Sequence, residues 1–321
     1  MKKIIFPVFA LLFVYSCKKS NQESPTVFTL ENIQQQILKK DTKKILFTLA
    51  ADSMKGRDSK SGGYTKAAEF VTDYFQANNI NPFYPKYQDS LNTDEIVSCN
   101  IVGQIGSYDP QKKTILIGAH LDHIGIQGSE GDTIYNGAND NATGSTAVLQ
   151  VGKYLAQYEW DQNILLALFA EEEKGLRGAY HLAKRFKDEN INLDYMVNFE
   201  MIGTTLTTGA NQVYMTGYTY SNMPELMNSI SPNFVQFLPQ AKELNLFKRS
   251  DNYAFYQILK IPAHTLSSFD FKNYNFYHKA EDEAEKLEIE NMNLIIQTTA
   301  FTLANMLKEN TEIKFSPTTK E

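Results

Sequence analysis

Acidic and imidazole side chains gather at the ends of three strands that the sequence predicts. These strands cover residues 114–119, 164–170 and 195–200, and each is a nearly continuous apolar run. The polar residues at or just after their ends are His120, Asp122, His123, Glu171, Glu172, Glu173 and Glu200. A single carboxylate at a strand end is usually solvated or caps a helix. Because open α/β sheets bind ligands beyond the carboxyl ends of their strands, several such ends together indicate a functional site.

Two further segments supply side chains of the same kinds. A polar loop at 137–141, Gly-Ala-Asn-Asp-Asn, leads into a predicted helix, and Tyr277 precedes His278 near the end of the chain. Imidazole nitrogens and carboxylate oxygens together form a ligand set suited to zinc. The sequence therefore predicts a zinc site.

In this order, the segments resemble the motifs of the co-catalytic zinc exopeptidases, a family that includes bacterial aminopeptidases, glutamate carboxypeptidases and transferrin receptors. The matching segments are 118–122 (Gly-Ala-His-Leu-Asp), 137–141, 172–176 (Glu-Glu-Lys-Gly-Leu), 198–203 (Asn-Phe-Glu-Met-Ile-Gly) and 277–278. Any one of them is a weak signal, whereas five in order are specific. The resemblance covers residues 41–307 and implies a zinc-dependent hydrolase.

The resemblance also implies a place for each metal ligand. Asp140 would bridge two zinc ions, with His120 and Glu200 completing one site and Glu173 and His278 completing the other. The family usually has Asp at the position of Glu200. The longer glutamate side chain leaves open whether two zinc ions are fully bound.

By the same resemblance, Glu172 would be the general base. The family spacing Glu-Glu-x-Gly-Leu fits 172–176, so Glu171 is expected to be a neighbour that does not touch the metal. Zinc lowers the pKa of water toward about 7, and a carboxylate beside that water takes its proton and later gives it to the leaving amine.

Two residues are assigned supporting roles. Asp122, two positions after His120, would hydrogen-bond that imidazole and fix its tautomer. Tyr277 is the candidate hydrogen-bond donor to the tetrahedral oxyanion. The alternative for Tyr277 is an aromatic side chain packed in a loop that is rich in Tyr and Phe.

Five other positions are interpreted from their surroundings in the sequence. His123 is expected to be structural, with direct involvement in the site as the alternative. His181 lies in a predicted helix and is expected on the surface, whereas His264, in an apolar strand, is expected in the core. Residues 249–252 (Arg-Ser-Asp-Asn) resemble a family segment near the site, and it stays open whether they line it. Gly56-Arg57 is either a turn or an approach to the catalytic face.

The elements that must position these residues alternate between strand and helix. Predicted strands cover 101–105, 114–119, 164–170, 195–200 and 261–267. Predicted helices cover 29–49, 64–78, 142–158, 179–188, 251–257 and 289–307. This alternation predicts a single α/β domain with a mixed, mostly parallel central sheet flanked by helices. The resemblance implies the zinc-peptidase/phosphorylase-like version of this fold.

The first 16 residues are typical of an export signal. Two lysines precede an uncharged apolar run over 4–15, which is shorter than the roughly 20 residues that a membrane-spanning helix needs. The run ends in Val-Tyr-Ser before Cys17, which resembles the lipobox of bacterial lipoproteins. The alternative is an ordinary secretory signal with an incidental cysteine. The predicted organisation is a signal peptide at 1–16, a lipidated tether at 17–28, an exopeptidase domain at 29–310 and a tail at 311–321.

Charge and cysteine content exclude other classes of protein. The net charge is −6 and becomes −8 without residues 1–16, so the chain has no basic surplus with which to bind nucleic acid. With Cys17 used as an anchor, only Cys99 remains, and a lone cysteine cannot form an internal disulfide. We therefore expect an exported protein that is anchored by lipid to the bacterial envelope and held together by its core.

The function expected from these observations is release of amino-terminal residues from small peptides, that is, an aminopeptidase with two zinc ions. The short connection between the strands at 101–105 and 114–119 leaves no room for the additional domain found in some relatives. Two alternatives share the fold. One is a single-zinc enzyme resembling the glutaminyl cyclases, and the other is a non-catalytic binding protein. Intact ligand positions argue against both.

Overall fold

The computed structural model describes residues 28–92 and 97–316. The predicted signal peptide, Cys17 and the tether up to residue 27 lie outside the described residues. None of the helices in the described part of the chain has the length and hydropathy to cross a membrane.

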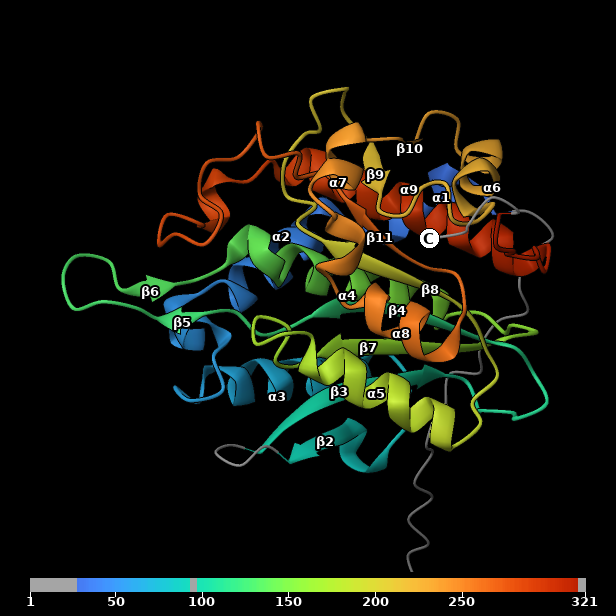
Figure 1. Ribbon diagram of the computed structural model, residues 1–321, viewed down its shortest axis with the longest axis horizontal. Coiled ribbons are helices and arrows are strands. Elements are labelled where there is room, and N and C mark those ends of the chain that lie inside the picture. The colour runs from blue at the N-terminus through green and yellow to red at the C-terminus, as the bar shows by residue number, and fades with distance from the viewer. Residues whose placement is uncertain (1–27, 93–96, 317–321) are drawn as a thin grey trace, which may run out of the picture.

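A nine-stranded mixed sheet forms the centre of the domain (Figure 1). Its strand order is β1-β3-β7-β4-β8-β11-β9-β10, with β2 paired to β3. The strands are β1 (Ile80–Pro82), β2 (Gln88–Asn92), β3 (Val97–Ile105), β4 (Thr114–His120), β7 (Asn163–Phe169), β8 (Leu193–Glu200), β9 (Val213–Met215), β10 (Val235–Gln236) and β11 (Ala263–Ser267). The four central strands β7, β4, β8 and β11 are parallel, so their carboxyl ends lie at one edge of the sheet.

Helices cover both faces of this sheet. One face carries α1 (Leu30–Gln36), α2 (Lys39–Leu49), α3 (Gly63–Ala77), α4 (Thr143–Leu155) and α9 (Ile289–Lys308), and the other carries α5 (Arg177–Asp188) and α8 (Asn252–Leu259). Smaller elements are α6 (Met223–Ile230), which packs on α9, α7 (Pro239–Glu243), and a separate ribbon of β5 (Gly125–Ile126) and β6 (Ile134–Tyr135). The predicted fold class is confirmed.

Each central strand is buried on both faces. On β4, Ile115 and Ile117 pack in the core beneath α4 and α9, while Leu116 packs beneath α5 and α8. On β7, Leu166 packs beneath α4 and α9, and Leu165 packs beneath α5 and α8. Because side chains alternate along a strand, two covered faces require an apolar residue at every position. This requirement explains the continuous apolar runs in the sequence.

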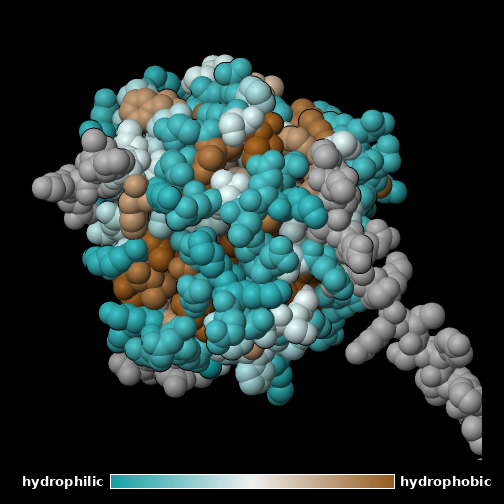
Figure 2. Space-filling view, turned by 90° about the vertical axis from the view of Figure 1, so that its right-hand side faces the viewer, coloured by the Kyte–Doolittle hydropathy of each residue, from teal (hydrophilic) through white to brown (hydrophobic). Residues whose placement is uncertain are grey.

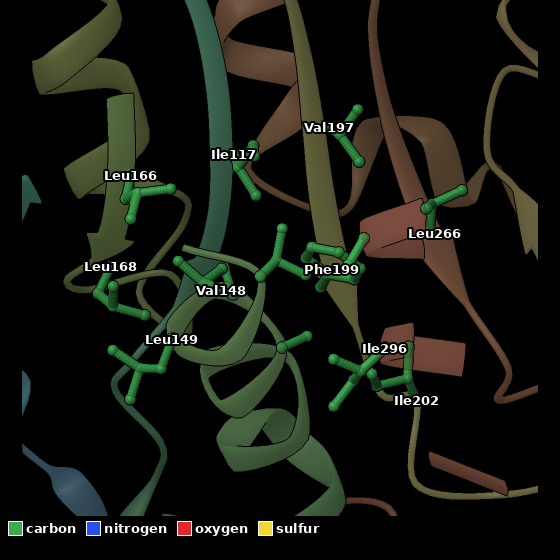
Figure 3. Packing of buried hydrophobic residues seen from close by; sticks show 14 of the residues in the cluster. Ile117, Val148, Leu149, Leu166, Leu168, Val197, Phe199, Ile202, Leu266 and Ile296 are labelled. Atoms are coloured by element: carbon green, nitrogen blue, oxygen red, sulfur yellow. The ribbon is translucent and has the colours of Figure 1, made fainter. Parts of the chain in front are cut away.

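Side chains from four strands and two helices meet in the larger core cluster (Figure 3). The labelled residues are Ile117, Val148, Leu149, Leu166, Leu168, Val197, Phe199, Ile202, Leu266 and Ile296. Phe199 and Ile202 flank Glu200, so the end of β8 is packed into this cluster. The outer surface is mostly hydrophilic on the face shown in Figure 2, with hydrophobic residues confined to smaller areas.

The predicted strands correspond to β3, β4, β7, β8 and β11, but the first predicted helix is wrong in one respect. The segment 29–49 forms two helices, α1 and α2, because the chain leaves the helical conformation at Ile37 and Leu38. The carbonyl of Ile37 accepts a hydrogen bond from Gln297 on α9 at 2.8 Å, which replaces a bond within a helix. The sequence did not predict β1, β2, β5, β6, β9, β10, α6 or α7, and most of these elements are too short to show a periodic pattern.

Both ends of the described chain pack on the domain. Phe28 is buried and stacks on Trp160 at a ring-centroid distance of 5.4 Å. The segment 311–316, predicted as a tail, contacts the loop before α6: the backbone N–H of Lys314 donates to Asn222 Oδ1 at 2.7 Å, and Ile313 is buried. The packed part of the chain therefore runs from Phe28 to at least Ser316.

Two histidines lie away from the predicted metal site. His181 on α5 is partly exposed, with its Nε2 3.2 Å from Asp89 Oδ1. His264 on β11 is buried, as predicted. Its Nδ1 donates to the carbonyl of Thr216 at 2.9 Å, and its Nε2 accepts from the Ser221 hydroxyl at 2.7 Å. Burial lowers the pKa of His264 to about 4 because it penalises the charged ring.

We expect His264 to make the free energy of unfolding depend on pH. An unfolded histidine titrates near 6.5 and the folded His264 near 4, so the unfolded chain binds more protons between these values. Stability contributed by this residue is complete above pH 6.5 and falls by about 3 kcal/mol as the pH drops to 4. Urea unfolding at pH 7 and pH 4.5 should show a smaller difference for His264→Gln than for the wild type. His181→Gln is the control, and an unchanged difference in His264→Gln would contradict the assignment.

Candidate metal centre

The side chains predicted as metal ligands meet at the carboxyl edge of the sheet. The parallel register aligns His120 at the end of β4 with Phe169 at the end of β7, so Glu172 and Glu173 follow close beside His120. Strand β8 pairs with the other side of β4 and ends at Glu200. Adjacent parallel strands thus bring three distant segments of the sequence to one place.

Asp140 lies between two groups of ligands. Its Oδ1 is 3.2 Å from His120 Nε2, which is itself 3.1 Å from Glu200 Oε1. Its Oδ2 is 3.1 Å from His278 Nε2, which is 3.2 Å from Glu173 Oε2. The five predicted ligands are therefore brought together in two groups that share one carboxylate.

These separations fit zinc. Two tetrahedral ligands, each about 2.1 Å from the same zinc ion, lie roughly 3.4 Å apart. The nitrogen–oxygen distances of 3.1 and 3.2 Å in both groups are close to this value. Oxygen and imidazole nitrogen are also the donor types that zinc accepts.

Glu172 faces the same space as the first group. Its carboxylate, His120 and Glu200 each offer a ligand atom within 4.8 Å of the others. Burial raises the pKa of Glu172 well above its usual value, and the nearby carboxylates of Asp251 and Glu200 raise it further. The site thus holds a carboxyl group that attracts a proton more strongly than an exposed glutamate does.

Asn139 and Asn141, the residues on either side of Asp140, hold their loop against the segment after β8. Asn139 Oδ1 accepts the backbone N–H of Gly203 at 2.9 Å, and Asn141 Oδ1 accepts that of Met201 at 3.1 Å. The peptide bond between Asp140 and Asn141 is cis. The two asparagines of the motif therefore fasten the loop to the segment after β8.

Asp282 also holds the loop that carries Asp140. Its Oδ1 accepts the backbone N–H of Asn139 at 2.8 Å and its Oδ2 that of Asp140 at 3.1 Å, while the Tyr274 hydroxyl donates to Oδ1 at 2.6 Å. Asp282 was not predicted as part of the site, since its position after the Tyr-His pair carries no chemical signal by itself.

His123 was expected to be structural, with direct involvement as the alternative, and its ring contacts the predicted metal ligands. Its Nδ1 is 2.8 Å from Glu173 Oε1 and 3.8 Å from Asp140 Oδ2. Gly137 allows this approach: it has φ +57°, and a Cβ there would lie 2.4 Å from the His123 ring. His123 is therefore a second imidazole, besides His278, in contact with Glu173, and its spacing of three residues from His120 was the available signal.

Asp122 makes contacts that differ from the expected one. Its carboxylate is 3.8 Å from His120 Nδ1, which instead lies 3.0 Å from the Asp122 backbone carbonyl. The carboxylate accepts the backbone N–H of Glu172 at 3.0 Å and that of Glu173 at 3.3 Å. The Asp122 carboxylate therefore hydrogen-bonds to two backbone N–H groups in the turn after β7 and not to the His120 ring. Asp122 thus orients the two glutamates directly, and His120 through its own backbone.

A pocket of about 550 Å³, which includes solvent at its mouth, opens onto the ligands. Tyr277 lines it and stacks on His278 with ring centroids 4.0 Å apart. Burial and nearby carboxylates raise the pKa of Tyr277, so its hydroxyl keeps its proton and can donate a hydrogen bond. Of the segment 249–252, whose place was left open, Arg249 and Ser250 line the pocket, and Asp251 and Asn252 are not among its lining residues.

Arg57 is buried behind the loop and uses all of its five N–H groups. Their acceptors are the backbone carbonyls of Leu121 (2.8 Å), Leu49 (3.0 Å), Asn136 (2.6 Å), Gly137 (2.8 Å) and Asp140 (3.3 Å). Burial lowers its pKa to about 10, opposed by the carboxylates of Asp140 and Asp282. Arg57 thus joins the end of β4, the end of α2 and the loop of Asp140.

The fold and the grouped ligands define an α/β protein with a metal site at the carboxyl edge of its sheet. The sequence profile of Peptidase family M28 matches residues 100–303. This chain belongs to that family.

Similar proteins agree with the assignment. A probable zinc metalloprotease of Pyrenophora tritici-repentis is 34% identical over 100 residues, which are 31% of this chain and 23% of that protein. The LapA aminopeptidase of Legionella pneumophila superposes with a TM-score of 0.69 at 18% identity, covering 90% of this chain and 77% of LapA. The glutaminyl cyclase of Porphyromonas gingivalis superposes with a TM-score of 0.66 at 13% identity, covering 84% and 99%. The chain thus spans about a quarter of the curated relative, and the structural likenesses establish the fold.

We expect Arg57→Lys to weaken the metal site as well as the fold. Lysine has three N–H groups, so at least two of the five buried carbonyls lose their partner, at a cost of about 2–5 kcal/mol in the free energy of unfolding. Urea unfolding with chelator measures this loss, and the rise in melting temperature on adding zinc should also become smaller. The exposed Arg177→Lys is the matched control. Equal stability of Arg57→Lys and wild type would show that the hydrogen bonds contribute little.

Proposed function

We propose that this protein is a zinc-dependent exopeptidase that releases amino-terminal residues from peptides. The observation that carries the proposal is the grouping of five ligands into two sites that share Asp140, with Glu172 beside them in one pocket. Membership of Peptidase family M28 supports it, as do the names of a probable zinc metalloprotease among the relatives and an aminopeptidase among the similar structures.

Two zinc ions are the cofactors proposed for this site. His120, Glu200 and Asp140 would hold one ion, and Asp140, Glu173 and His278 the other, with His123 as a further donor near Glu173. Bound zinc lowers the pKa of water and polarises a carbonyl oxygen.

The remaining chemistry is assigned to residues of the chain. Glu172 takes the proton of the attacking water and gives it to the leaving amine, because its carboxylate lies beside the ligands in the same pocket. Tyr277 donates a hydrogen bond to the oxyanion that forms at the carbonyl oxygen when water adds to the carbonyl carbon. Asp122 holds the backbone of Glu172 and Glu173, so base and ligand keep their relative positions.

The charge of the pocket favours the amino-terminal end of a peptide. Asp140, Glu172, Glu173 and Glu200 all line it, and a free α-amino group is a cation near neutral pH. An acetylated peptide would lose this attraction.

We expect the wild type to cleave a free dipeptide such as Leu-Ala and not its N-acetylated form, with turnover rising until two zinc ions are bound. The substitution Glu172→Gln should lower kcat by about 10²–10⁴ while the zinc content stays the same, because the substitution removes the base and leaves the metal ligands in place. The matched control is Glu171→Gln, one residue away and outside the pocket, which should retain turnover within a few-fold.

Three outcomes would contradict this assignment. Turnover of Glu172→Gln near the wild-type rate would exclude it as the base. Cleavage of the acetylated peptide would indicate a different exopeptidase specificity. Absence of hydrolysis at every zinc level would contradict the peptidase proposal, and ammonia release from a glutaminyl peptide would then identify a cyclase.

We also propose that the chain is exported and anchored to the cell envelope through Cys17, on the strength of the apolar run at 4–15 and the Val-Tyr-Ser-Cys17 segment. Cys17→Ser, expressed in a bacterium with its native leader, should move the protein from the membrane fraction to the soluble fraction. Cys99→Ser is the control and should stay with the membrane. Retention of Cys17→Ser in the membrane would contradict the lipid anchor.

A further inference from the structure

Arg249 brings a positive charge to one wall of the pocket. It is the only Lys or Arg among the described residues that line this space. Four carboxylates line the same space and would repel an anionic ligand: Asp140, Glu172, Glu173 and Glu200. A cation at this wall therefore changes which substrates the pocket can accept.

The backbone at Arg249 is fixed next to the metal ligands. Its N–H donates to the carbonyl of Leu246 at 3.0 Å and ends a short helical turn. The following residue, Ser250, is buried, donates through Oγ to Glu200 Oε2 at 2.8 Å and accepts from Asn198 Nδ2 at 2.9 Å. The side chain of Arg249 thus starts from a rigid position beside Glu200, although the residue itself is exposed.

The guanidinium of Arg249 has no hydrogen bond or ion pair with any residue in the described part of the chain. The other arginines near the sheet differ. Arg57 donates to five carbonyls, and Arg185 pairs with Asp89 and Glu189. A guanidinium presents a planar set of donors that matches the two oxygens of a carboxylate. Arg249 therefore lines the pocket with a guanidinium whose donors are unpaired among the described residues.

We propose that Arg249 binds a carboxylate of the substrate, so that the enzyme prefers peptides with an anionic group close to the scissile bond. This inference rests on the proposed peptidase function. The carboxylate belongs either to the side chain of an amino-terminal Asp or Glu or to the carboxyl terminus of a dipeptide, because both present the same group. Leu246, Phe269 and Phe271 line the pocket as well and would contact the apolar part of such a substrate.

Two substrate pairs, assayed with the zinc-loaded full chain, test the proposal and separate the two sources. One pair is Leu-Ala and Leu-Ala amide, and the other is the p-nitroanilides of Glu and Gln. In one pair, Arg249→Gln should lower kcat/KM for the carboxylate-bearing member by roughly 10- to 100-fold, mainly through KM, and change the neutral member by less than about threefold. The matched control is Lys248→Gln, an adjacent exposed cation that does not line the pocket.

The pair that responds identifies the source of the carboxylate. Equal effects of Arg249→Gln on both members of both pairs, or the same response to Lys248→Gln, would overturn the proposal. Calorimetric binding of the same four compounds to Glu172→Gln, with and without Arg249→Gln, decides the question even if the wild type hydrolyses nothing. Affinity that depends on the carboxylate and is lost with Arg249→Gln supports the carboxylate site, and equal affinities overturn it. Failure of the peptidase proposal is seen separately, as absence of hydrolysis of all four compounds.

Discussion

The concentration of buried carboxylates at one sheet edge is the constraint on which the rest of the structure depends. Asp122, Asp140, Asp251 and Asp282 are all buried there, and charges removed from water are costly unless they are paired or hydrogen-bonded. In the described part of the chain, Arg57 is the only buried Lys or Arg. One guanidinium cannot offset this many carboxylates. Divalent cation binding at this edge would, which favours a metal site over a structural ion-pair network.

Several residues beside this edge of the sheet have left-handed backbone conformations. Arg57, Glu171, Leu176, Met201 and His278 all have positive φ, between 47° and 58°, although none is glycine. Such residues are strained by about 1 kcal/mol or more and persist only where the surroundings hold them. For Glu171, Leu176 and Met201 the surroundings include the packed ends of β7 and β8, which precede these turns. The core stabilises a set of turns that would not form alone, and those turns direct the ligands at one another.

Much of this could be predicted from the sequence, for a definite physical reason. Strands buried on both faces are continuous apolar runs, so β4, β7 and β8 were visible, and the ligands His120, Glu173 and Glu200 and the proposed base Glu172 lie at or just after their ends. The contacts of Asp122 were not predictable, because a carboxylate near both an imidazole and two backbone N–H groups can bond to either. The role of Arg57 was also hidden, since its five acceptors are carbonyls, which every residue has.

The pocket is built from two kinds of segment. Its metal-binding end rests on the sheet and on the loop held by Arg57 and Asp282, whereas its opposite walls come from the segments around 246–250 and 269–277, which lie between short elements. Loops placed on a rigid scaffold commonly carry specificity, because they can change without disturbing the core. Those walls have no periodic pattern, and this is why the class of chemistry follows from the sequence while the choice of substrate does not. An unpaired arginine on such a wall alters specificity without altering the reaction, since it contributes charge to the pocket and no ligand to the metals.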